Sequence, residues 1–182
     1  EVNISSNNTN FTEQDVVVAK YADFGVTVTE GTVEENLLAG RDAVKIGKFY
    51  MEEGIPASLS QNKTIYLELE DGAKWGTNPT ATFEKGAGIT LGGWSVVGTD
   101  GKVIKRAVGT PSTTAAKICM ENARVYLNPD FEGDLKVKVY GSAGAEGEVK
   151  VATVIKPIKI EASEATKVVI GGANQKVADI TI

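Results

Sequence analysis

The sequence predicts an all-β protein: an antiparallel β-sandwich, Ig-like or jelly-roll-like, with an extended N-terminal arm. Short runs of alternating apolar and polar residues recur along the chain, as is typical of half-buried strands. Turn signals separate these runs at spacings of about 8–12 residues, as in sandwich folds. No long helical periodicity interrupts them, so two packed antiparallel sheets are the expected architecture.

The chain of 182 residues fits one large β domain better than two. Its first residues are polar and lack periodicity. We therefore predict an N-terminal arm and candidate donor strand over residues 1–20, followed by a sandwich domain over residues 21–182. Residues 32–41 have helix-like character, because Thr32 and Glu35 have the spacing of a capping box. There we predict one short helical turn or a loop.

Strict alternation predicts two strands with particular clarity. Their apolar faces carry Ile65, Leu67 and Leu69 in the first strand and Leu135, Val137 and Val139 in the second. Asp100 and Gly101 predict a two-residue hairpin turn. Trp75 lies shortly before a break at Asn78 and Pro79, so we place it in the core at a sheet corner.

Composition and charge disfavour several function classes. The net charge is -5, and Lys and Arg are scattered rather than clustered, so we expect no nucleic-acid partner. Histidine, the commonest general base and zinc ligand, is absent, and no catalytic motif occurs, so we do not expect an enzyme. No run approaches the roughly 20 apolar residues of a membrane span. Cys119, the single cysteine, lies in an apolar run and is interpreted as a buried structural thiol.

Residues 128–134 contain the best metal candidate. The candidate ligands are Asn128, Asp130, Glu132 and Asp134, with Gly133 in the sixth place, as at the start of a calcium loop. The glutamate that would close such a loop is missing, because Val139 stands in its place. A turn with solvated acids accounts for the same residues, so we expect no cofactor, with calcium as the alternative.

Four sequons favour export from the cell. Their asparagines are the glycosylation candidates Asn3, Asn7, Asn10 and Asn62. A polar tail also generates such triplets by chance. The chain begins at Glu1 rather than at a methionine, which we interpret as a mature chain after signal-peptide removal. We expect an extracellular or cell-surface location.

Three stretches carry a family resemblance. They are residues 65–75, with the pattern Leu-x-Leu-x-Asp-Gly-x-x-Trp at 67–75, residues 131–154 and residues 168–182. From about residue 24 to the C-terminus, the chain resembles the β-rich extracellular region of secreted bacterial proteins that also carry a copper-amine-oxidase N-terminal-like stalk domain. The resemblance implies a cell-surface location, tandem β modules and a scaffolding role, with no catalytic residue to transfer.

The function that we predict is that of an extracellular structural subunit. Copies would assemble head to tail into a filament or surface layer, with a terminal strand of one copy completing a sheet of the next. The assembly residues are Val16, Val17, Val18, Val26 and Val28 at one end and Ile180 and Ile182 at the other. The alternative is a monomeric surface module that binds glycans or cell wall through Trp75, Trp94, Tyr66 and Tyr140.

Overall fold

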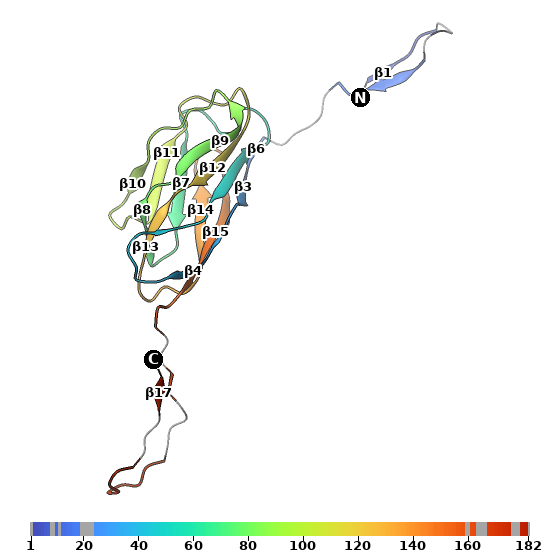
Figure 1. The fold of residues 1–182 in the computed structure, drawn as a ribbon. Coiled ribbons are helices and arrows are strands. Elements are labelled where there is room, and N and C mark those ends of the chain that lie inside the picture. Colours follow the sequence, from blue (N-terminus) through green and yellow to red (C-terminus); the bar gives the residue numbers. More distant parts are fainter. Residues whose placement is uncertain are drawn as a thin grey trace.

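The computed structural model describes residues 2–7, 10, 12–18, 24–158, 161–162, 167–175 and 179–181. All regular elements among these residues are β-strands, which confirms the predicted fold class (Figure 1). The strands form antiparallel sheets packed face to face as a sandwich. Within the same residues there is no candidate for a membrane-spanning helix.

The larger sheet has six strands in the order β10-β11-β7-β14-β15-β4. Their bounds are β10 Ser95–Val97, β11 Val103–Ala107, β7 Thr64–Leu69, β14 Gly133–Tyr140, β15 Gly147–Ile155 and β4 Glu34–Leu38. Neighbouring strands are antiparallel except at one edge, where β4 runs parallel to β15. The predicted two-residue turn at Asp100 and Gly101 is wrong in length, because the five residues 98–102 connect β10 to β11. Gly101 lies within this connection with a left-handed φ of 72°.

The second layer contains four strands in the order β3-β6-β12-β9. Their bounds are β3 Val26–Glu30, β6 Phe49–Glu53, β12 Thr114–Glu121 and β9 Thr80–Ala87. A three-stranded sheet, β5-β13-β8, comprises β5 Val44–Lys45, β13 Arg124–Leu127 and β8 Ala73–Thr77. Its strands adjoin β6, β12 and β9 in sequence and follow the same lateral order, so it extends this layer past a bend.

The core lies between the two layers and follows the alternation of the sequence. The predicted inward residues of β7 and β14 are all at most 1% exposed. Met51 and Ile118 face them from β6 and β12, and both are fully buried. Trp75 is 8% exposed in β8, directly before the break to β9, as predicted. Alternation therefore identifies the buried face of each of these strands correctly.

The predicted helical turn or loop at residues 32–41 is wrong, because residues 34–38 form strand β4. The hydroxyl of Thr153 on β15 donates to the Glu35 carboxylate and accepts the Asn36 backbone N–H at 3.0 Å. Thr32 accepts the Lys48 N–H instead of capping a helix. A single turn of helix is weak on its own, and pairing with the free side of β15 outweighs it.

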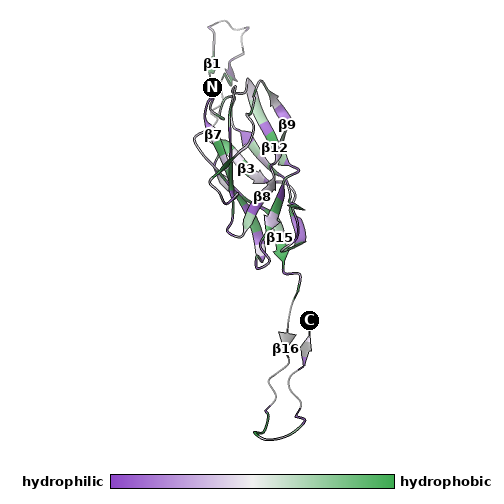
Figure 2. Ribbon diagram, turned by 90° about the vertical axis from the view of Figure 1, so that its left-hand side faces the viewer, coloured by the Kyte–Doolittle hydropathy of each residue, from purple (hydrophilic) through white to green (hydrophobic). Residues whose placement is uncertain are grey.

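Two short hairpins lie outside the sandwich. Strands β1 Val2–Ile4 and β2 Gln14–Val16 pair near the N-terminus, and β16 Glu161–Ala162 and β17 Ile180–Thr181 pair near the C-terminus. The two hairpins extend from opposite ends of the elongated sandwich in both views (Figures 1 and 2). The predicted domain ran from residue 21 to residue 182, whereas the described strands of the packed sheets run from Val26 to Ile155.

Candidate functional site

The β1–β2 hairpin is an amphipathic ribbon. Val2 pairs directly with Val16, and Ile4 pairs with Gln14, so these four side chains share one face. Asn3 and Asp15 pair on the other face, where the Asn3 amide donates to the Asp15 carboxylate at 3.0 Å. We call the first face the apolar face of the hairpin.

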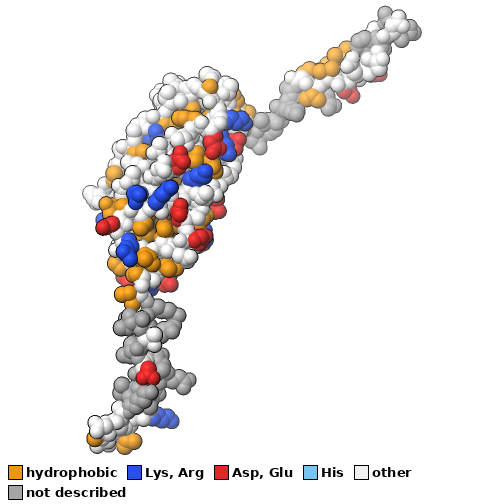
Figure 3. Space-filling view, in the orientation of Figure 1, with side chains coloured by type: hydrophobic (Ala, Val, Ile, Leu, Met, Phe, Trp, Pro, Cys, Tyr) orange, Lys and Arg blue, Asp and Glu red, His pale blue; other side chains and the backbone are white. Residues whose placement is uncertain are grey.

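The apolar face of the hairpin is exposed to solvent. Val2, Ile4 and Val16 are 46%, 43% and 37% exposed, and Val17 and Val18 beyond them are 52% and 65% exposed. Figure 3 shows hydrophobic side chains gathered on this ribbon, away from the body of the sandwich. Because an isolated two-stranded hairpin is at best marginally stable in water, this ribbon needs a further strand or a surface to cover it.

One lateral side of the sandwich, which we call the closed edge, joins the two layers through β3 and β15. Val26 forms a bridge with Ala145, and the Glu30 carboxylate accepts the Lys150 backbone N–H at 3.1 Å. Val28 packs against the core beside Gly147. Val26 and Val28, two of the predicted assembly residues, thus belong to a strand that β6 pairs within the same domain.

The opposite lateral side, which we call the open edge, runs along β9 and β10, the last strands of their sheets. Phe83 on β9 aligns with the buried Ile118 and so faces inward, yet it is 47% exposed. Val96 on β10 aligns with the buried Ile104 and also faces inward, yet it is 56% exposed. Both sheets therefore present an inward apolar side chain to solvent on the same side.

Trp94 marks the boundary between the covered and the uncovered part of this side. Its indole N–H donates to the Pro79 carbonyl at 2.7 Å, and the Arg106 guanidinium lies 4.7 Å from the ring centroid. Burial lowers the pKa of Arg106. On the β8 side of Pro79, the Trp75 backbone N–H donates to the Gly101 carbonyl, so a loop closes the sandwich there. Sequence reasoning missed the open edge, whose signal is Phe83 alternating with polar neighbours.

The C-terminal candidates lie in a different environment. Ile180 belongs to β17, and Ile182 lies outside the described residues. Val168, Val169 and Ile170 between β16 and β17 are 56%, 72% and 102% exposed and have no strand geometry. The Gln175 amide instead holds this segment as a loop by donating to the Val169 and Gly172 carbonyls at 2.6 and 2.9 Å.

Two of the three acidic residues at 128–134 have lysine partners. Lys150 lies 2.8 Å from the Asp134 carboxylate, and Lys156 lies 3.3 Å from that of Glu132. Asn128 and Asp130 sit in a turn. In the part of the chain that the structure describes, no three His, Cys, Asp or Glu side chains are grouped as metal ligands. Calcium binding at this loop stays a prediction.

Of the four predicted platform aromatics, the structure stacks Tyr66 on Tyr140. Their ring centroids are 5.2 Å apart and the planes differ by 12°. Both side chains lie on the outer face of the six-stranded sheet, and burial, first of all, raises the pKa of Tyr140. Trp75 is buried in the core and Trp94 lies beneath Arg106. The tryptophans thus do not form one flat platform with the tyrosines.

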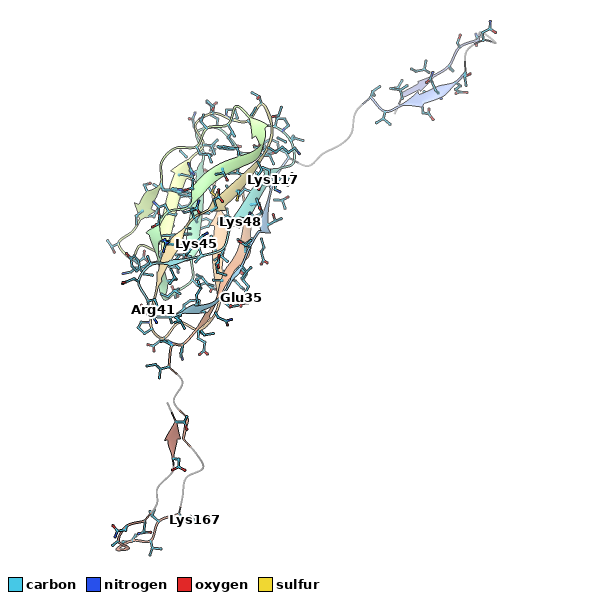
Figure 4. All side chains as sticks on the ribbon, viewed as in Figure 1. Glu35, Arg41, Lys45, Lys48, Lys117 and Lys167 are labelled. Carbon is cyan, nitrogen blue, oxygen red and sulfur yellow. The ribbon has the colours of Figure 1, made fainter. Side chains whose placement is uncertain are left out.

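Tyr50 carries two cations on the outer face of the four-stranded sheet. Lys117 and Lys48, both labelled in Figure 4, lie 4.4 and 5.6 Å from its ring centroid. Cys119 pairs with Tyr50 on the neighbouring strand and is 2% exposed. Burial raises the pKa of the Cys119 thiol, so it stays protonated and unreactive, as expected of a structural cysteine.

Glu53 is a buried charged residue, 3% exposed at the end of β6. Its carboxylate accepts the backbone N–H groups of Leu59 and Ala116, both at 2.8 Å, and the Ser112 hydroxyl. Three donors satisfy the carboxylate and tie two loops to the sheet. This arrangement accounts for the burial of the carboxylate.

All four sequon asparagines are exposed. Asn3 lies on the polar face of the β1–β2 hairpin, and Asn7 and Asn10 lie in the connection between its strands. Asn62 occupies a turn with a φ of 57°, where asparagine is better tolerated than most residues. Their accessibility is compatible with glycosylation, which stays a prediction.

Comparison with protein-family models, curated proteins and solved structures finds no match to this chain. The resemblance to the extracellular regions that accompany a copper-amine-oxidase N-terminal-like domain stays a prediction. The two edges of the sandwich and the terminal hairpins are therefore the features that bear on function.

Proposed function

We propose that this chain is an extracellular structural subunit that assembles head to tail by β-strand complementation. Copies form a filament or surface layer in which a terminal strand of one copy extends a sheet of the next. Main-chain hydrogen bonds supply affinity in such contacts, and alternating apolar side chains set the register. The chain then acts through its surfaces, without catalysis.

The observation that carries the proposal is the exposed apolar face of the β1–β2 hairpin. Val2, Ile4 and Val16 align on one face of a strand pair, yet all are more than a third exposed. The sandwich meanwhile has a continuous core of its own. The core therefore does not use the N-terminal ribbon, and the ribbon is amphipathic. Such a segment is suited to pairing with another copy of the chain.

Electron microscopy and size-exclusion chromatography across a concentration series test this proposal. We expect the full chain to form filaments with a fixed repeat. Deletion of residues 1–20 should leave a folded monomer, because the core lies between Val26 and Val154. Deletion of residues 159–182 is the matched control and should still polymerise. A full chain that stays monomeric, or filaments that survive the N-terminal deletion, would contradict assembly through this hairpin.

The alternative is a monomeric module that binds glycans or cell wall. The stacked pair Tyr66 and Tyr140 favours it, since the pair borders a charged groove that includes Glu68, Lys102 and Lys138. Pull-down of the monomer on cell-wall polysaccharide tests this function. Binding that Tyr66→Ala abolishes, together with a monomeric state at all concentrations, would favour the glycan module over the filament.

A further inference from the structure

We propose that the open edge is the acceptor and that the β1–β2 hairpin of a second copy is its occupant. In this contact β2 pairs with β9, and the apolar face of the hairpin covers Phe83 and Val96. The inference rests on the proposed assembly function and specifies which surfaces meet. It applies to contacts between copies of this chain.

The two layers of the sandwich differ in width at the open edge. The larger sheet has six strands, whereas the facing sheet has four and ends at β9. The inward row that crosses the four-stranded sheet is buried at Met51 and Ile118 but half exposed at Phe83. The corresponding row of the larger sheet is buried at Ile104 but exposed at Val96. Two added strands would make both sheets six strands wide and cover both side chains.

β9 has a free edge that can pair with another strand. β9 is eight residues long and pairs with β12 alone among the described strands. Its register is regular over residues 80–83 and is shifted by bulges beyond them, so the other side of residues 80–83 offers the unpaired backbone groups. A long exposed edge strand is a template for pairing with another chain. On the β8 side of Pro79, the Gly101 carbonyl already accepts the Trp75 backbone N–H. β9 is therefore the segment that is available for pairing with another strand.

The β1–β2 hairpin has the width and the apolar face needed to cover the open edge. It is two strands wide, and one of its faces is apolar while the other carries Asn3 and Asp15. With β2 beside β9, the apolar face turns toward the facing sheet and the polar face toward solvent. A glycan on Asn3 would then project outward. The exposed C-terminal segment at 168–170 lacks strand geometry and fits this edge less well.

Charge also favours this pairing. Residues 12–16 contain two acids, Glu13 and Asp15, and no base. The open edge presents the inward-facing Arg106 and Lys85, whose side chain is 66% exposed and lies 3.8 Å from the Glu52 carboxylate. Glu84 on the same strand already pairs with Lys117 at 3.0 Å. Acidic donor and basic acceptor groups steer the two surfaces together.

The topology favours a second copy over the chain's own hairpin. The N-terminal segment leads into β3, which lies at the closed edge, whereas β9 is at the other end of the same sheet. Two strands, β6 and β12, separate them, so the chain's own hairpin would have to cross this sheet to reach β9. Donor and acceptor therefore leave the molecule on opposite sides. Such a heterologous contact propagates as a filament unless its rotation closes a ring.

Mixed disulfide cross-linking tests the inference. One preparation carries Val17→Cys, which alternates with Val16 and so belongs to the outer face of the docked hairpin. A second carries Glu84→Cys, on the outer face of β9. Thr29→Cys, exposed on β3 at the closed edge, is the matched control, and Cys119 is replaced by alanine throughout. We expect the Val17–Glu84 heterodimer and at least about tenfold less product with Thr29→Cys.

Phe83→Ser gives a second, independent readout. Phe83 is half exposed, so the variant should fold, while the concentration needed for assembly should rise about tenfold. Tyr126→Ser removes an aromatic ring that is 41% exposed on β13 and should leave assembly unchanged. Filaments that form without the Val17–Glu84 product would overturn this inference and leave the proposed function standing. A chain that never polymerises or cross-links would overturn both.

Discussion

The closed and open edges of the same sandwich differ in how well they cover the core. At the closed edge, β3 lies against β15, and Glu30 supplies an acceptor for the Lys150 backbone N–H. At the open edge, Phe83 and Val96 face inward, yet each is about half exposed to solvent. One side is thus completed by contacts within the chain, and the other is the side that we propose receives a second copy. Substitutions at the closed edge should therefore change stability, and substitutions at the open edge should change assembly.

Gly47→Ala should have the largest effect on stability, because it adds a methyl group at the closed edge, where neighbouring backbone atoms approach Gly47 closely. A Cβ at Gly47 would lie 1.7 Å from the Thr32 carbonyl oxygen and 2.8 Å from that of Val151. The Val151 oxygen cannot move away without breaking the hydrogen bond that it accepts from the Gly47 N–H at 2.9 Å. We expect a loss of about 3 kcal/mol or more in the free energy of unfolding.

Gly93→Ala is the matched control for that substitution at the open edge. A Cβ there meets no atom within 4 Å. The free energy of unfolding in urea should change by no more than about 0.5 kcal/mol. If both glycine variants lose similar stability, the contrast between the edges is wrong.

Glu30→Ala should have an intermediate effect on the closed edge. The substitution leaves the Lys150 N–H without its carboxylate acceptor, which lies 3.1 Å away. We expect a loss of about 1 kcal/mol in unfolding free energy, since the freed N–H is accessible to water. Glu146→Ala, another exposed glutamate near β15, is the control. Native-state hydrogen exchange at Lys150 should accelerate only in the Glu30 variant, and unchanged exchange there would contradict the role of Glu30.

Val96→Thr should leave the monomer almost unchanged while weakening assembly. The side chain keeps its shape and is 56% exposed, so unfolding free energy should shift by no more than about 0.5 kcal/mol. Sedimentation should show a several-fold rise in the concentration needed for polymerisation, because the docked surface becomes more polar. An assembly-neutral Val96→Thr would remove Val96 from the acceptor surface.

The sequence predicts the strands of this fold better than it predicts their neighbours. Strict alternation marks the buried faces of β7 and β14, because each strand's own pattern records which face meets the core. The local pattern at residues 32–41 instead favoured a helical turn. Its strand partner, β15, lies more than 100 residues away, and no short-range signal records that pairing.

The candidate site divides in the same way. Val16, Val17 and Val18 could be named from composition, since a valine run follows a polar tail. Val26 and Val28 look alike in sequence, yet they lie in an intradomain strand because β6 and β15 cover them. Phe83 and Val96 could not be identified in advance, because their exposure arises only when one sheet ends two strands before the other.

The smallest effect should come from Asp71→Asn, near the loop that covers β8 on the open side. Lys102 lies 2.8 Å from the Asp71 carboxylate and lowers its pKa below the usual 3.8. A lowered pKa in the folded state stabilises the fold above pH 3.8, and this contribution disappears as the pH falls through the lowered value. Asp71 and Glu68 raise the pKa of Lys102 above 10.5, so the lysine's contribution disappears only as the pH rises through that raised value.

The melting temperature of Asp71→Asn should therefore lie slightly below that of the wild type at pH 7, and the two should converge well below pH 3.8. The Asp71 carboxylate is almost fully exposed, so high salt should also reduce the difference. Asp130→Asn, at another exposed aspartate, controls for the change in net charge. A difference that persists unchanged in strong acid would show that Asp71 supports the loop through its turn geometry, without a contribution from its charge.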